Sequence, residues 1–427
     1  MLVASTFLQR SQSLFGLIVF TLLALGIGRL RGARAIPWRV VFWGVVLQFV
    51  FAVVVLFAPR LLETVQFAIQ KLLDFTLAGV DLLFAGLSRP DIPVVGPDGK
   101  PAGVAQVGVI FAVVVLPTII FISMLTAMLY HLGIMTAVVH MLAYVMHKTM
   151  GTSGAETLST AANIFVGQTE APLVIKPFLA MATRSELMAI MVGGFANIAS
   201  GVLVVYTDLL KAYIPNVGGH LAAACFISAP ATLVVSKLMI PESDTPETAG
   251  GVQFKVERVD ANLIDAATRG TTEGTALAIN VGAMLIAFTA LVAMLNAIFT
   301  SLTGQTMEQL LGYVMSPLAW LSGVSWAESR TVGSLLGVKT VLNEFLAYLQ
   351  MSQGFAKDPN YLSPRGALIA TYGLCGFANF ASVGIQIGGI STMAPTRRHD
   401  LSRLGLLAMV GGAIASLMGA CVVGVLI

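Results

Sequence analysis

Long apolar segments separated by short polar loops recur along the whole chain. A membrane-spanning helix needs about 20 mostly apolar residues. Eight segments approach that requirement, at 11–28, 40–58, 104–130, 186–206, 219–240, 275–299, 366–394 and 404–427. Pro117 predicts a kink in the third of them. The pattern predicts an all-α polytopic membrane protein with eight transmembrane helices.

Three further segments mix apolar and polar residues at helical spacing, which is typical of helices that lie along a membrane surface. These segments are 60–106, 131–150 and 305–328, and a turn from Pro90 to Gly103 is expected to end the first. Residues 241–272, which include Lys255–Arg258, form the most polar stretch of the chain. We interpret that stretch as a linker between two halves.

Two segments, about 155–181 and 329–352, are too interrupted by polar residues to be simple spans. The first carries Gln168, Thr169 and Glu170, and the second carries Asn343 and Glu344. Irregular backbone is tolerated at membrane depth only where protein or a water-filled cavity covers it. Each segment is therefore predicted to be a re-entrant hairpin, entering the membrane and returning to the same side.

A nearly identical heptad follows each hairpin, which indicates an internal repeat. Gly-Phe-Ala-Asn-Ile-Ala-Ser occupies 194–200, and Gly-Phe-Ala-Asn-Phe-Ala-Ser occupies 376–382. The order of the spans makes the two hairpins enter from opposite sides, which is the inverted repeat of secondary transporters. The predicted domains are two scaffold parts, 1–150 and 241–328, and two transport repeats, 151–240 and 329–427.

Two arginine clusters predict the orientation of the chain in the membrane, because cytoplasmic loops carry an excess of basic residues. They comprise Arg29, Arg31, Arg34 and Arg39, and Arg397, Arg398 and Arg403. Because eight spans place both termini on the same side of the membrane, and both arginine clusters are expected in the cytoplasm, both termini are predicted to lie outside. The first apolar segment lacks a charged leader and a clear cleavage site, so we expect it to be retained as a span.

Composition supports the membrane class and excludes others. Of 427 residues, 57% are hydrophobic and 11% are charged, and the mean hydropathy is +0.87. The net charge of +3 is concentrated in loops, so no nucleic-acid-binding face is expected. No nucleophile motif, phosphate-binding loop or cysteine–histidine pair suggests an enzyme. The three cysteines are isolated in apolar runs and predict neither a disulfide nor a metal site.

The carboxylates are the strongest functional signals, because a charged side chain in mid-bilayer costs at least about 2.5 kcal/mol. Glu170 and Glu344 could serve as structural hydrogen-bonding groups, as ligands for a polar solute, or as proton carriers. Asn197 and Asn379 could cap breaks in their own helices, or could contact ion and solute. Phe377 could belong to the core or could stack on a ring.

At these residues the chain resembles the concentrative nucleoside transporter family, in its short bacterial form. The motif residues are Gly167-Gln168-Thr169-Glu170-Ala171-Pro172, Asn343-Glu344-Phe345 and Cys375-Gly376-Phe377-Ala378-Asn379-Phe380, followed by Ser382 and the Gly-Ile-Gln-Ile-Gly-Gly run at 384–389. The resemblance extends from about residue 15 to the end of the chain. It implies a homotrimer whose protomers each hold a scaffold and a mobile transport part.

The resemblance also implies a substrate site and a sodium site. Gly167, Gln168, Thr169 and Glu170 would lie at the nucleobase, Glu344, Asn379 and Ser382 at the ribose, and Phe377 beside the solute. The sodium ion would lie near Asn163, Val166, Asn197 and Ile198. Asn197 stands where the family has Ser or Thr, and this departure leaves proton coupling open.

The predicted function is therefore sodium-coupled symport of nucleosides such as uridine, by an elevator-like movement across a bacterial inner membrane. A proton-coupled symporter of nucleosides or of another neutral polar solute is the alternative, since Glu344 could carry a proton. The expected partners are the nucleoside, the lipid bilayer and two further copies of the chain. The sequence does not distinguish purine from pyrimidine preference, stoichiometry or conformational state.

Overall fold

The computed structural model describes residues 6–33, 35–88, 91–95, 97–98, 100–106, 110–250 and 260–427. Three parts of the sequence interpretation lie outside these residues. They are Arg34 of the first arginine cluster, Pro90 at the start of the expected turn, and Lys255–Arg258 of the linker.

Seven helices or helix pairs in the described residues are long and apolar enough to cross a membrane. They are α1 (Phe7–Leu30), α2 (Trp38–Leu56), α4 with α5 (Phe111–Val114 and Leu116–His131), α9 with α10 (Arg184–Ala196 and Ser200–Leu210), α11 (Val217–Met239), α12 (Leu263–Thr303), and η3 with α18 (Pro395–Arg397 and Arg398–Leu426). The chain is therefore a multi-pass helical membrane protein. The kink predicted at Pro117 corresponds to the boundary between α4 and α5.

The remaining expected span, 366–394, is divided into α16 (Pro364–Leu374) and α17 (Phe380–Met393). Each half is too short to cross a membrane by itself. The backbone between them is extended at Asn379, and Asn197 has the same extended conformation between α9 and α10. The two heptads therefore coincide with two helix breaks.

Both predicted hairpins are helix–turn–helix segments in the structure. The first consists of α7 (Gly154–Ala162), a turn, η2 (Ala171–Ile175) and α8 (Lys176–Leu179). The second consists of α14 (Trp326–Val341) and α15 (Glu344–Lys357), so this hairpin ends later than the predicted residue 352. Asn343 begins α15 by accepting a hydrogen bond at Oδ1 from the Leu346 amide (2.9 Å).

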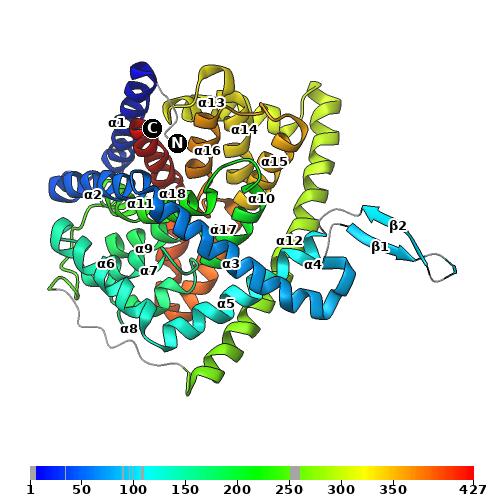
Figure 1. The fold of residues 1–427 in the computed structure, drawn as a ribbon. Helices are drawn as coiled ribbons and strands as arrows, with labels where there is room; N and C mark the ends of the chain where they lie inside the picture. The colour runs from blue at the N-terminus through cyan, green and yellow to red at the C-terminus, as the bar shows by residue number, and fades with distance from the viewer. Residues whose placement is uncertain are drawn as a thin grey trace.

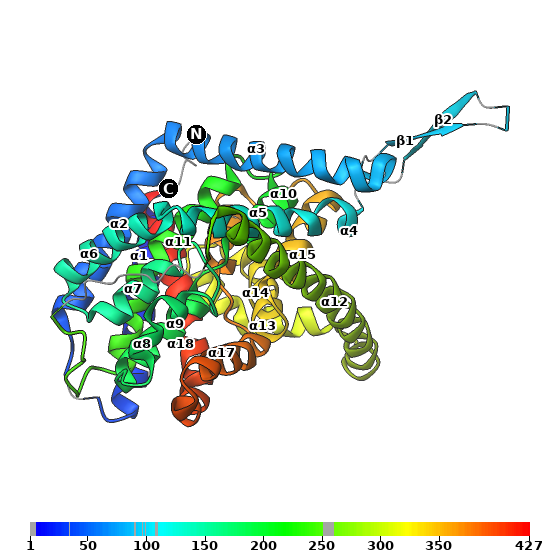
Figure 2. The ribbon, with the colours of Figure 1, turned by 90° about the horizontal axis from the view of Figure 1, so that it is seen from below.

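The amphipathic segments form α3 (Pro59–Phe84), α6 (Ile134–Met150) and α13 (Met307–Leu321). Helix α3 crosses one side of the bundle and leads to a protruding strand pair (Figure 2). Helix α13 packs along α14 and so covers the second hairpin.

The all-α prediction is wrong between α3 and α4. After η1 (Ala85–Ser88), strands β1 (Asp91–Val95) and β2 (Pro101–Gln106) form an antiparallel hairpin that projects from the bundle (Figure 1). Valines favour extended backbone, and Pro97-Asp98 is a typical turn sequence. The third span consequently begins at Phe111 and not at 104.

The polar linker is shorter than predicted, because α12 begins at Leu263 within the expected loop 241–272. Asn262 caps this helix, its Oδ1 accepting from the amides of Ile264 and Asp265 (both 3.0 Å). Arg269 then forms ion pairs with Asp260 (2.7 Å) and Glu273 (3.0 Å). These contacts let a polar segment extend α12 beyond its apolar part.

Burial separates the central helices from the edge of the molecule. The apolar windows of α9–α10 and α11 are each 89% buried and that of α18 is 78% buried, whereas that of α12 is 6% buried. Helix α12 lies at one edge of the ribbon and packs mainly along α5 (Figure 1). The first heptad, at the break between α9 and α10, thus lies within the most buried part of the fold.

Candidate functional site

A cavity of about 220 Å³ lies where both hairpins meet the breaks in the helices. Its lining comes from the first hairpin, α10, α12, the second hairpin and the segment joining α16 to α17. The structure brings together in it all the residues that the sequence assigned to a solute: Gly167, Gln168, Thr169, Glu170, Glu344, Phe377, Asn379 and Ser382.

Glu344 is the buried acceptor of this cavity, with 5% of its surface exposed. Its Oε1 accepts a hydrogen bond from the Tyr206 hydroxyl (2.8 Å), and its Oε2 accepts one from Asn379 Nδ2 (3.1 Å). It is also the first residue of α15, where the partial positive charge of the helix terminus stabilises an anion. A carboxylate has about four acceptor positions, so two remain for donors from the cavity.

Asn379 has the capping role that its position suggested, and it also lines the cavity. Its Oδ1 caps α17 by accepting from the Ser382 amide (2.8 Å), which directs its Nδ2 to Glu344. Gly376, three residues earlier, has a φ of +131°. A Cβ atom there would lie 2.7 Å from the Phe195 carbonyl oxygen of the other heptad, so the close approach of the two breaks requires glycine.

On the first hairpin, a chain of amides fixes Gln168. Its Nε2 donates to Ser382 Oγ (3.3 Å), and its Oε1 accepts from Gln386 Nε2 (3.1 Å). Gln386 Nε2 also donates to the Met191 carbonyl (3.1 Å). The Gln168 amide is therefore oriented by α17 and α9 before any solute arrives.

Glu170 differs from Glu344 because its side chain is exposed in the described chain and lines the open side of the cavity. Thr169 Oγ1 donates to its Oε1 (3.2 Å). Its Oε2 lies 2.2 Å from where a Cβ atom on Gly167 would stand, so the glycine leaves room for the carboxylate to fold back. The two carboxylates thus offer one buried and one accessible acceptor.

Sequence reasoning missed three residues of this site. Tyr206 donates to Glu344, Gln386 orients Gln168, and Asn280 contributes an amide from α12 to the lining. Gln386 lies inside the glycine-rich run 384–389 and is the polar exception there, which is a signal that could have been used. Tyr206 and Asn280 lie in ordinary spans and carry no such local signal.

Two of the residues assigned to sodium, Asn163 and Asn197, belong to a second group of buried polar side chains around Gly193. Asn163 is buried, and neither its Oδ1 nor its Nδ2 has a hydrogen-bond partner. Thr160 and Thr232 hydroxyls are likewise buried without partners. A Cβ atom on Gly193 would lie 3.1 Å from Asn163 Nδ2 and 3.6 Å from Thr160 Oγ1, which places these groups around one glycine.

Neutral oxygens without partners fit a hard monovalent cation, since unwound backbone carbonyls and side-chain oxygens coordinate Na⁺ in broken-helix transporters. Val166 and Ile198 would contribute backbone carbonyls, and the Ile198 carbonyl otherwise accepts only a weak bond from Cys225 Sγ (4.0 Å). Asn197 is already engaged: its Oδ1 accepts from Ser228 Oγ (2.6 Å) and its Nδ2 donates to the Gly193 carbonyl (3.3 Å). One acceptor position on Oδ1 remains.

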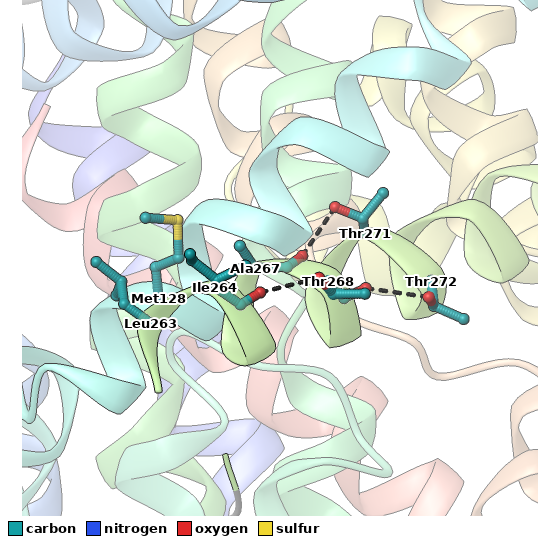
Figure 3. A pocket seen from close by; sticks show the side chains of 7 residues that line it. All are labelled: Met128, Leu263, Ile264, Ala267, Thr268, Thr271 and Thr272. Carbon is teal, nitrogen blue, oxygen red and sulfur yellow. Dashed lines mark hydrogen bonds between the residues drawn. The ribbon is translucent and has the colours of Figure 1, made fainter. Parts of the chain in front are cut away.

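A second hollow, between α5 and α12, has a volume of about 360 Å³ and different chemistry (Figure 3). Its threonines 268, 271 and 272 each donate to the carbonyl four residues earlier in α12. The remaining lining is apolar, and no carboxylate of the described residues belongs to it. Of these two cavities in the described residues, only the first has the features expected of a solute site.

A polar cavity between broken helices, inside a bundle of apolar spans, defines a membrane transporter and not an enzyme. Comparison with known families agrees. Residues 15–87 and 220–424 match the N-terminal and C-terminal models of Na⁺-dependent nucleoside transporters, and residues 112–213 match a nucleoside recognition (gate) model. The chain belongs to the Na⁺-dependent nucleoside transporter family, for which sodium is the coupling ion.

Individual relatives support the assignment along the full chain. An uncharacterized transporter of Haemophilus influenzae is 39% identical over 97% of both chains. Sodium/nucleoside cotransporter 1 of Mus musculus is 38% identical over 92% of this chain, which spans 60% of the mouse protein. The solved structure of CNTnw in an inward-facing substrate-bound state covers 97% of both chains, with 37% identity and a TM-score of 0.86.

Proposed function

We propose that this protein is a sodium-coupled symporter that concentrates nucleosides such as uridine, with the cavity between the hairpins as its substrate site. The observation that carries the proposal is the arrangement around Glu344. Tyr206 and Asn379 occupy one acceptor position on each carboxylate oxygen, and two positions remain for adjacent hydroxyl donors. A ribose presents such a pair of hydroxyls.

The nucleobase would lie toward the first hairpin. Gln168 offers both a donor and an acceptor, Thr169 offers a hydroxyl, and Glu170 accepts from ring or exocyclic N–H groups. Gly167 lets the backbone approach closely, and half-buried Phe377 would pack beside the solute while Ser382 contacts the ribose. Two carboxylates in one site favour neutral solutes over anions.

Coupling follows if Na⁺ binds among Asn163, Val166, Asn197 and Ile198. Asn163 and Gln168 lie on the same turn of the first hairpin, so an ion at the former restricts the backbone that carries the latter. A nucleoside that binds to an already ordered hairpin loses less conformational entropy, which makes the two binding events cooperative. Each ligand then raises the affinity for the other.

Elevator-like movement would shift the transport repeats, 151–240 and 329–427, against the scaffold parts, 1–150 and 241–328. We place the protein in a bacterial inner membrane as a homotrimer, with both termini periplasmic and the arginine clusters cytoplasmic. The exposed apolar surface of α12 suits contact with lipid or with another subunit.

Uptake of radiolabelled uridine into proteoliposomes tests the proposal, with an imposed Na⁺ gradient compared with an imposed pH gradient. Accumulation driven by Na⁺ alone is the expected result. Accumulation driven only by a pH gradient would favour the proton-coupled alternative, in which the buried carboxylate of Glu344 carries the proton. Failure of both gradients would contradict uridine as a substrate.

A further inference from the structure

Lys339 is a buried cation that the proposed function does not use. It lies near the end of α14 in the second hairpin, and 2% of its surface is exposed. Its Nζ donates to the Gly373 carbonyl (3.0 Å), and no carboxylate of the described residues forms an ion pair with it. Burying an ammonium without a bonded carboxylate is unfavourable, so its position calls for a physical reason.

The surroundings of Lys339 explain its burial, because its ammonium lies at the C-terminal end of α16, where that helix breaks. The last carbonyls of a helix have no partners within it and carry a partial negative charge. Gly373 accepts from Lys339, and the Thr371 carbonyl accepts from the Tyr348 hydroxyl (2.7 Å) of α15. The second hairpin thus supplies both a charged and a neutral donor to this helix end.

The internal repeat allows the carbonyl that binds Lys339 to be compared with the corresponding carbonyl of the first repeat. Aligning the heptads at 194 and 376 gives an offset of 182 (376 − 194), so Gly373 corresponds to Met191, which lies five residues before the last residue of α9 (Ala196). There the Met191 carbonyl accepts from the neutral amide of Gln386 (3.1 Å). Asn163 of the first hairpin, with its unpartnered amide, lies near the same helix end.

We propose that Lys339 is a tethered cation that permanently holds the second hairpin against the α16–α17 break. The sodium ion would hold the first hairpin against the α9–α10 break in the same way, but reversibly. This inference rests on the proposed function. Lys339 is a positioning residue: it joins the hairpin that carries Glu344 to the broken segment that carries Asn379.

The contact reaches both ends of the ribose site through short stretches of chain. Glu344 follows Lys339 by five positions, across the hinge at Leu342 and Asn343, and Asn379 follows Gly373 by six. The ribose half of the cavity is therefore organised without a mobile ion, whereas the nucleobase half requires one.

Hydrogen–deuterium exchange on the wild-type protein, without nucleoside, tests this division directly. Replacing N-methylglucamine with Na⁺ is expected to slow exchange in the first hairpin, 154–179, and to leave the second hairpin, 326–357, unchanged. Slowing of comparable size in the second hairpin would overturn the proposal. This readout is independent of uridine, so it stays informative even if the proposed substrate is wrong.

Two matched substitutions separate charge from hydrogen bonding. Lys339→Met keeps most of the apolar length of the side chain and removes the ammonium with its charge and its hydrogen bond. Tyr348→Phe removes only the neutral donor to the same helix end. At saturating Na⁺ we expect Lys339→Met to weaken uridine binding at least about tenfold, the loss typical of a charge-assisted contact, with Tyr348→Phe affected much less.

Wild-type affinity in Lys339→Met, or an equal loss in both variants, would overturn the role of the charge. If Lys339→Met does not yield folded protein, the exchange measurement on the wild-type chain decides the question. If the wild-type protein does not bind uridine at all, the proposed function fails and the exchange result still stands for or against the tethered cation.

Discussion

Replacing Glu344 with glutamine is the most direct perturbation of the proposed ribose site. The substitution preserves volume, removes the charge and turns one acceptor oxygen into an NH₂ donor. That donor would face either the Tyr206 hydroxyl or the Asn379 amide, both of which donate to Glu344 in the wild-type protein. At least one of the two acceptor positions left for the solute is lost.

The expected magnitude follows from the kind of bond removed. A hydrogen bond to a charged group contributes about 1.5–3 kcal/mol, which corresponds to a loss of roughly 10–150-fold in affinity. Tyr206 and Asn379 can rotate to relieve part of the donor–donor contact, so folding is expected to survive the substitution.

Isothermal titration of uridine into the purified protein at saturating Na⁺ measures this effect. Glu308→Gln provides the control, because it makes the same chemical change in a carboxylate that bonds Asn296 (3.0 Å) and lies outside the cavity lining. Thermal unfolding of both variants separates weaker binding from lost structure. A Glu344→Gln variant that binds uridine with wild-type affinity would refute the ribose assignment.

Three further substitutions test neighbouring parts of the site. Asn163→Ala removes the unpartnered buried amide and is expected to raise the Na⁺ concentration for half-maximal uptake several-fold; an unchanged sodium dependence would rule out that ion site. Gln386→Leu frees the Gln168 amide and is expected to weaken nucleoside binding about tenfold, the size of one or two neutral hydrogen bonds, as titration would show. Gly167→Ala displaces the flexible Glu170 carboxylate, so titration should show weaker binding while the unfolding temperature stays within a few degrees.

Much of the transporter could be predicted from local sequence because membrane insertion imposes strong one-dimensional rules. Apolar length identified seven of the eight expected spans as helices long enough to cross a membrane. Polar residues within apolar segments identified two helix–turn–helix segments. The repeated heptad identified both helix breaks, since its glycines and asparagine are residues that leave helical backbone readily. The polar motifs also contained the solute-site residues that the structure gathers in one cavity.

Prediction failed where local signals were weak or competed with one another. The sequence predicts a turn after a surface helix where the β1–β2 hairpin lies, because the strands are short and contain proline and glycine. The sequence predicts a linker where α12 begins, because the first turns of this helix are rich in polar residues. Composition does not show the Asn262 cap and the Arg269 ion pairs that stabilise them as helix. In both places the overall composition of the segment decides the prediction, although the sequence contains a turn signal in the first and a capping residue in the second.

The sequence by itself determined the class of protein, the two hairpins and the residues that face one another across the repeat. Only the tertiary structure decided how those residues are held. Tyr206 and Glu344 are 138 positions apart, and Gln386 and Gln168 are 218 apart. No spacing rule links such pairs, because their contact depends on how whole helices pack. The same holds for Lys339, whose ammonium interacts with the C-terminal end of α16 only after folding brings the two together.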